Sequence, residues 1–108
     1  MSSTAALDHT MLALADPTRR AILQRLGAGE ARVTDLAAPF AMSLNAVSKH
    51  IRILERAALI SRRRAGREHV LSLTPAPLDE AAAWIESQRQ FWTNRLDALE
   101  QALAAHED

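Results

Sequence analysis

Apolar residues recur along this chain with two different spacings. Before residue 57 and again after residue 77 they return every three or four positions, which is the spacing of one face of an α-helix. Between residues 59 and 74 they instead alternate with polar residues on either side of Ala65-Gly66, as in a β-hairpin. The pattern therefore predicts a mainly α-helical chain with one small β-hairpin.

Two short helices are expected first. One covers about residues 7–14 and ends before Asp16-Pro17, where Asp suits the N-cap of a new helix and Pro suits its first position. The second helix starts at Pro17 and stops at Gly27 and Gly29. Its apolar positions are expected to face a core: Ala21, Ile22, Leu23 and Leu26.

A brief third helix is expected after residues 30–33, which can be extended. We expect Thr34 to cap this helix, which carries Leu36, Ala37 and Phe40. Pro39 would remove one hydrogen bond from a helix and crowd the preceding turn, so this helix should be short or distorted.

The segment from Ser43 to Ala57 predicts a helix with two distinct faces. Ser43 is a good N-cap after a tight connection. One face is apolar, at three- and four-residue spacing: Val47, Ile51, Leu54 and Ala58. The other face is polar and basic: Asn45, Ser48, Lys49, Arg52 and Arg56. His50 lies at the border between the faces, where we expect it to pack or hydrogen-bond within the domain.

The last helix is predicted over about residues 77–105. It carries one apolar stripe, made of Leu78, Ile85, Trp92, Leu96, Leu99 and Leu103, and a second stripe beside it, made of Trp84, Phe91 and Ala98. A helix of about 29 residues is longer than a domain of this size needs. We therefore expect one stripe to pack on its own domain and the other on a partner chain. The candidate dimer-interface residues are Trp84, Phe91, Trp92, Leu96 and Leu99.

The composition fits one soluble domain over residues 1–108. The chain has 108 residues, 48% of them apolar, and no cysteine. The lack of cysteine excludes a thiol nucleophile, an iron–sulfur cluster and a thiolate zinc site. The first residues do not resemble a signal peptide, and no apolar run approaches the roughly 18 residues of a membrane span. We therefore expect a cytoplasmic protein that does not bind a membrane.

Charge is distributed unevenly, although 13 basic and 13 acidic residues balance overall. Residues 43–74 carry seven Lys or Arg against two Glu, whereas residues 75–108 carry two Arg against seven acidic residues. A compact basic segment is typical of a protein that binds a polyanion, and an acidic tail should point away from that ligand. Ordinary solvated helix faces are the alternative explanation of the same charges.

The predicted order of elements is that of a winged helix-turn-helix with a long C-terminal dimerisation helix. In this fold the polar-faced helix reads the major groove of double-stranded DNA, and the basic hairpin, or wing, reaches the flanking backbone. We place the reading helix at about residues 43–57 and the wing at about residues 59–74. The candidate DNA-binding residues are Ser43, Asn45, Ser48, Lys49, Arg52, Arg62, Arg64 and Arg67. Arg63 should point the other way, because neighbours along a strand alternate in direction.

At these residues the chain resembles the ArsR-type family of bacterial transcription regulators. The matching segments are Ala13-Leu14-Ala15-Asp16-Pro17-Thr18-Arg19-Arg20, Asp35-Leu36-Ala37, Ser43 to Leu54 with Val47-Ser48-Lys49-His50, and Gly66-Arg67. A further stretch, containing Trp84, Phe91-Trp92 and Arg95-Leu96-Asp97, resembles one subgroup of that family. The resemblance implies a homodimeric regulator, usually a repressor, that blocks a promoter by binding an operator.

The chain departs from the metal sensors of this family at their ligands. A familiar sensing box reads Glu-Leu-Cys-Val-Cys-Asp-Leu, and here Arg32 and Thr34 replace both thiolates. A second family site uses Asp, His and Glu on the last helix of two chains, where this chain offers only Asp97, His106 and Glu107 at uneven spacing. We therefore predict no metal ion and no cofactor. A small-molecule effector, control by transcript level and constitutive repression all stay open.

Ala58 is a further departure, because relatives commonly carry Gly at this end of the reading helix. If residue 58 is left-handed, Ala costs about 1 kcal/mol relative to Gly. We therefore expect Ala58→Gly to raise the melting temperature.

An interaction protein is the main alternative from another functional class. In that case the basic hairpin would form a rim for an acidic partner protein, and sequence-selective DNA binding would separate the two hypotheses. No spaced nucleophile–base pair, metal motif or phosphate-binding loop indicates an enzyme.

Overall fold

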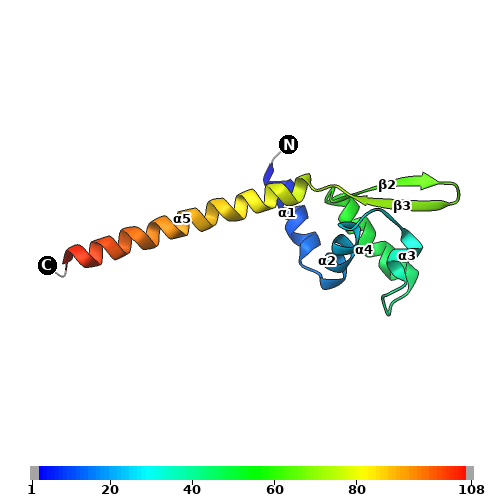
Figure 1. Ribbon diagram of the computed structural model, residues 1–108, viewed down its shortest axis with the longest axis horizontal. Coiled ribbons are helices and arrows are strands. Elements are labelled where there is room, and N and C mark those ends of the chain that lie inside the picture. The colour runs from blue at the N-terminus through cyan, green and yellow to red at the C-terminus, as the bar shows by residue number, and fades with distance from the viewer. Residues whose placement is uncertain (1–2, 107–108) are drawn as a thin grey trace.

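The protein consists of a helical head with a small sheet, from which one long helix extends (Figure 1). The computed structural model describes residues 3–106. The elements are α1 (Ser3–Leu14), α2 (Pro17–Leu26), β1 (Ala31–Arg32), α3 (Val33–Ala37), α4 (Leu44–Arg56), β2 (Ile60–Ala65), β3 (Glu68–Leu73) and α5 (Ala76–His106). The predicted fold class, mainly helical with a β-hairpin before a long last helix, is confirmed.

Asp16 separates α1 from α2 and caps the second helix. Its Oδ2 accepts a hydrogen bond from the backbone N–H of Arg19 at 3.0 Å. This bond lowers the pKa of the Asp16 carboxyl below its ordinary value, because it stabilises the charged form. At the other end, Gly27 remains in the right-handed region, with φ −62°, and Gly29 adopts a φ of +142° that redirects the chain towards β1.

The hydrophobic core gathers around one face of α4. Val47, Ile51 and Leu54 have no exposed surface, as predicted. The residues that surround them from other elements are Ile22, Leu23, Leu26, Leu36, Leu59, Ile60 and Leu71. Two residues predicted for the core, Ala21 and Ala58, are exposed instead. Ala21 lies outside the buried stripe of α2, and Ala58 lies beyond the end of α4, where helical spacing no longer applies.

The three strands form one antiparallel sheet in the order β1-β3-β2. The expected extended segment before α3 is confirmed as β1, in which Ala31 pairs with Leu71. Val70 and Leu71 are both buried, so the strict alternation predicted for the hairpin is wrong. Val70 pairs with Arg32 on one side and Arg63 on the other, and the aliphatic parts of these two side chains flank it on the same face.

Thr34 does not cap α3, contrary to the prediction. The helix begins at Val33, one residue earlier, and Arg32 occupies the N-cap position without a side-chain hydrogen bond. The expectation of a short helix is confirmed, since α3 has five residues and ends at Ala37, before Pro39.

α5 leaves the head soon after it begins (Figure 1). Leu78 is partly buried and Ala81 is buried against the head, but every described residue of α5 from 82 to 106 is exposed. The expectation that one apolar stripe packs on its own domain is therefore wrong beyond Ala81. The radius of gyration, 19.7 Å, exceeds the roughly 13 Å of a compact domain of this length. Within residues 3–106, no helix is both long and apolar enough to cross a membrane.

Ala58 is the left-handed residue that ends α4, with a φ of 58°. The N–H of Leu59 donates to the carbonyl of Leu54 at 3.1 Å, and the N–H of Ala58 donates to the carbonyl of Glu55 at 2.9 Å. These two bonds define a Schellman motif, and buried Leu54 and Leu59 supply the apolar contact that accompanies it. The left-handed conformation considered for residue 58 is thus confirmed.

Replacing Ala58 with Gly should stabilise the protein. The left-handed conformation costs Ala about 1 kcal/mol relative to Gly, and for a chain of this length the melting temperature should rise by about 4 °C. Thermal unfolding followed by circular dichroism measures the shift. The control is Ala57→Gly one residue earlier, where φ is −82° and the side chain is buried, and its melting temperature should fall. An unchanged or lower value for Ala58→Gly would contradict the strain argued for this residue.

Candidate nucleic-acid interface

The outward face of α4 carries most of the predicted DNA-binding side chains. Ser43 begins the helix, and its Oγ accepts a hydrogen bond from the backbone N–H of Ala46 at 3.1 Å, which confirms the predicted N-cap. Because the apolar stripe of the helix is buried, the polar residues are turned away from the core. Three of them are exposed and the fourth is half-buried: Asn45, Lys49 and Arg52, and then Ser48.

The arginines of the wing, the hairpin of β2 and β3, point in alternate directions. Arg62 donates from Nη2 and Nε to the two carboxylate oxygens of Glu55 on α4, at 2.7 and 3.1 Å. Glu55 thereby raises the pKa of Arg62 above its ordinary value. Arg63 donates instead to Glu30 at 2.6 Å, so it points away from Arg62, as expected.

The tip of the wing is a two-residue turn. Gly66 has a φ of +65°, in the left-handed region that suits the first position of such a hairpin turn. Arg64 donates from Nε to the carbonyl of Gly66 at 3.1 Å, so its side chain curls back over the turn. Arg67, the second turn residue, is exposed.

A cavity of about 260 Å³ lies between the wing and the start of α4. Three predicted DNA-binding residues line it: Ser48 from α4, and Arg62 and Arg67 from the wing. The rim also includes Arg32 and Glu68, which form an ion pair at 3.0 Å. The fold therefore brings the reading helix and the wing to one site, although they are separate in sequence. The other predicted residues lie outside this cavity: Ser43, Asn45, Lys49, Arg52 and Arg64.

The surface of α4 and the wing keeps a net positive charge after its internal pairs are counted. Within residues 3–106, the basic residues of this segment without a carboxylate partner are Lys49, Arg52, Arg56, Arg64 and Arg67. The acidic residues of the segment are both occupied, because Glu55 pairs with Arg62 and Glu68 pairs with Arg32. The arrangement can therefore attract an anionic chain along one surface.

Sequence reasoning missed the carboxylates that hold the wing arginines. Glu30 pairs with Arg63, 33 positions away, and Arg32 pairs with Glu68, 36 positions away. No spacing within one helix or strand signals such contacts, because they form only when the sheet brings distant segments together. In the folded sheet, the β3 register places Arg32 and Arg63 on either side of Val70.

The described residues hold no group of three side chains suited to a metal ion. Arg32 and Thr34, at the thiolate positions of the family box, offer no thiolate, and Arg32 is paired with Glu68. Asp97 and His106 are nine residues apart on α5, which separates them by about 13 Å along the helix axis. Glu107 lies outside the described residues.

Comparison with known proteins identifies relatives along the whole chain. A family pattern described as a helix-turn-helix domain matches residues 14–63. The HTH-type transcriptional regulator Rv2034 of Mycobacterium tuberculosis is 38% identical over 108 residues, covering 100% of this chain and 98% of that protein. The transcriptional repressor SdpR of Bacillus subtilis is 34% identical over 79 residues, covering 73% of this chain and 88% of that protein.

Solved structures agree in fold and family. An ArsR-like transcriptional regulator from Rhodococcus sp. RHA1 is 31% identical, with a TM-score of 0.80 over 94% of this chain and 95% of that one. A second structure, described as an ArsR family transcriptional regulator, is 40% identical, with a TM-score of 0.78 over 82% of this chain and 97% of that one. With a reading helix, a basic wing and a long last helix in the same order, this chain belongs to the ArsR family of winged helix-turn-helix transcription regulators.

Proposed function

We propose that this DNA-binding regulator is a homodimeric repressor that occupies a specific double-stranded operator. The observation that carries the proposal is the single surface formed by the outer face of α4 and the wing, with five cations that lack a carboxylate partner in the described structure. α4 would enter the major groove, and the wing would follow the flanking backbone. The naming of SdpR as a repressor supports the sign of regulation. Because chromosomal DNA is the ligand, the proposed location is the cytoplasm.

The side chains of this surface divide into two kinds of contact. Asn45 lies exposed in the first turn of α4 and can pair with adenine through its amide, so it is the residue we assign to base recognition. Ser48, Lys49 and Arg52 follow on the same face and serve base edges or phosphates. Arg62, Arg64 and Arg67 are assigned to phosphates or an adjacent minor groove, as befits cations on a wing.

The exposed face of α5 supports assembly into a dimer with a second copy of this chain. Its large apolar side chains are Trp84, Ile85, Phe91, Trp92, Leu96, Leu99 and Leu103. The chain exposes 7670 Å², whereas a folded monomer of its mass exposes about 6,000 Å². The excess is about twice the roughly 800 Å² that each partner loses in a standard interface. A second α5 would cover this face and set two reading helices at a fixed separation, as two operator half-sites require.

The first experiment is a comparison of two DNA duplexes by fluorescence anisotropy at fixed salt. One is taken from upstream of the gene for this chain, and the other is a shuffled duplex of the same composition. A specific regulator should prefer its own site by about a thousandfold or more. Similar, strongly salt-dependent binding to both duplexes would show that the upstream duplex does not contain a specific operator. Absence of binding would favour the alternative in which the wing binds an acidic protein.

Two arginines of the wing provide a matched test of contact with the phosphate backbone of DNA. Arg67→Ala should weaken binding to every duplex by a similar factor and lower the slope of log affinity against log salt by about one, because one phosphate contact is lost. Arg63→Ala removes the same side chain from the same hairpin, but its guanidinium points to Glu30, so the slope should not change. Equal slopes for the Arg67 and Arg63 variants would contradict this division.

Asn45→Ala should change which sequence is preferred. Loss of a bidentate contact to one base relaxes discrimination at that position by about 1–3 kcal/mol and leaves the salt slope unchanged. Selection from random duplexes by the wild type and the variant measures the preference position by position. Equal loss of affinity for operator and shuffled DNA would show that Asn45 does not read a base.

A charge placed in the apolar face of α5 should separate the two chains. Trp92→Arg should give monomers in sedimentation velocity, with poor affinity for the operator. Gln101→Arg adds the same charge nine residues further on, about two and a half turns away and therefore on the opposite side of the helix, and it should stay dimeric. Persistence of the Trp92→Arg dimer would place the interface elsewhere.

A further inference from the structure

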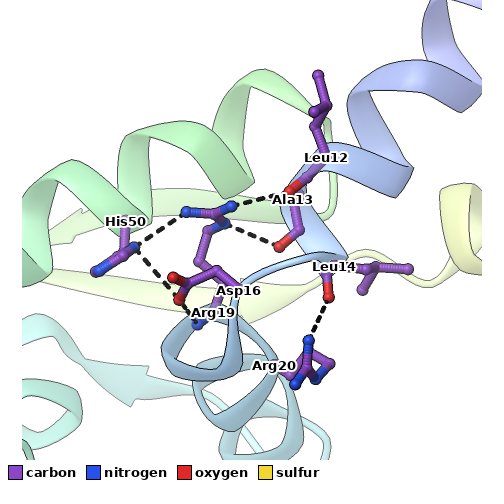
Figure 2. Close-up of polar contacts among 7 residues, drawn as sticks. All are labelled: Leu12, Ala13, Leu14, Asp16, Arg19, Arg20 and His50. Atoms are coloured by element: carbon purple, nitrogen blue, oxygen red, sulfur yellow. Dashed lines mark hydrogen bonds and ion pairs between the residues drawn. The ribbon is translucent and has the colours of Figure 1, made fainter.

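A polar cluster joins the corner between α1 and α2 to the reading helix (Figure 2). Arg19, in the first turns of α2, uses three different nitrogens in it. Nε donates to the carbonyl of Ala13 and Nη2 to the carbonyl of Leu12, both at 2.8 Å. Nη1 lies 3.2 Å from Nδ1 of His50, which belongs to α4. One side chain of α2 therefore contacts two other helices, α1 and α4.

The position of the Arg19 guanidinium is strongly restrained. The carbonyls of Leu12 and Ala13 belong to the last turn of α1, where the helix dipole favours a cation. The Leu12 carbonyl also accepts from the backbone N–H of Ala15, at 3.2 Å. Arg20 satisfies the next carbonyl, that of Leu14, at 2.8 Å. With two of its nitrogens fixed on α1 and its backbone N–H fixed on Asp16, Arg19 presents Nη1 to the reading helix in a set direction.

The chemistry of this contact assigns the roles of the two groups. A guanidinium can only donate, so Nδ1 of His50 is the acceptor in the hydrogen bond from Arg19. Asp16 Oδ2 also lies near this ring nitrogen, at 3.7 Å. The contact between Arg19 and His50 is therefore a charge-assisted hydrogen bond in which the imidazole accepts.

His50 lies at a position on α4 where a rotation of the helix about its axis would directly change the contact with Arg19. It follows Ser48 and Lys49, which belong to the outward face, and its own side chain is 22% exposed at the border of the core. The apolar contacts of α4 are non-directional, whereas a hydrogen bond prefers a narrow range of distance and angle. The contact with Arg19 thus adds a directional restraint on the rotation of α4 about its axis to the non-directional restraint of its buried stripe.

We propose that Arg19 and His50 are positioning residues for DNA recognition, which set the orientation of α4 relative to α1 without touching DNA. The proposal rests on the proposed function and adds an intramolecular contact that orients the interface without being part of it. α1 packs against α5, so the same bond connects the face assigned to dimerisation with the reading helix. Loss of the hydrogen bond between Arg19 and His50 should reduce operator affinity more than affinity for other DNA. The reason is that only specific binding needs an exact alignment of side chains with base edges.

The test compares two replacements of His50 in the full chain. His50→Asn keeps an acceptor close to the position of Nδ1, whereas His50→Leu keeps a similar volume without one. The probes are the duplex that the wild type selects from random sequence and a shuffled version of it. His50→Leu should bind the selected duplex about tenfold more weakly, in line with the loss of a charge-assisted hydrogen bond, and change little on the shuffled one. His50→Asn should stay within about threefold of the wild type on both.

Two further measurements distinguish a positioning role of His50 from direct contact with DNA. They are the salt dependence of binding and the effect of combining a His50 variant with an Arg19 variant. The slope should be unchanged in His50→Leu, and a slope lower by about one would show that the ring itself contacts phosphate and would overturn the proposal. Arg19→Lys should lose the same selectivity, and combining it with His50→Leu should cost little more than either change alone. Additive losses would overturn the pairing.

Further outcomes distinguish this proposal from the proposed function. If His50→Leu does not fold, His50→Gln replaces it, since its amide sets the acceptor at the far end of the ring and should lose selectivity in the same way. A selective wild type with an equally selective His50→Leu would overturn the positioning role alone. A wild type that selects no sequence would overturn both.

Discussion

Burial of one stripe of α4 is the constraint on which the rest of the head depends. Val47, Ile51 and Leu54 are fully buried, and each such side chain contributes about 1.5–3 kcal/mol relative to exposure. A rotation of α4 that exposed any of them would also move Asn45 and Lys49 away from the surface that they share. The same stripe continues through Leu54 into the Schellman motif, which directs the chain into β2. The position of the wing thus follows from the packing of the helix that precedes it.

The ion pairs of the wing contribute more to geometry than to stability. Those of Arg32 and Arg63 are about half exposed and that of Arg62 about a third, and exposed ion pairs of this kind contribute little to stability because water screens them. A bidentate carboxylate nevertheless holds a guanidinium in one plane, as Glu55 does for Arg62. Arg62 is thus presented to the cavity beside α4 in a defined orientation, whereas Arg67 at the tip has no carboxylate partner within residues 3–106. The wing combines one fixed cation with one adaptable cation.

Much of the fold could be predicted from local pattern, and the failures share a physical cause. The two faces of α4, the Ser43 cap and the short α3 follow from helical spacing and from residues whose preferences act within a few positions. Thr34 was wrongly placed because helix ends depend on where the preceding strand stops, and β1 pairs with β3 far along the chain. The expectation that one stripe of α5 packs on its own domain is wrong beyond Ala81, because an apolar stripe does not say which surface covers it. The pairing of Arg19 with His50 needs three helices in place, and the sequence pattern indicated only that His50 lies at a border.

The exposure of α5 also determines what the intrinsic tryptophan fluorescence of this protein can report. Its two tryptophans, Trp84 and Trp92, both lie on α5, where they are 47% and 61% exposed, and the chain has no tyrosine. The head therefore contains no strong intrinsic fluorophore. Indole emission shifts to shorter wavelength when water leaves its surroundings, so the native spectrum reports directly on the covering of α5. Neither tryptophan lies on α4 or the wing, so an event at the proposed DNA surface would reach the spectrum only through α5.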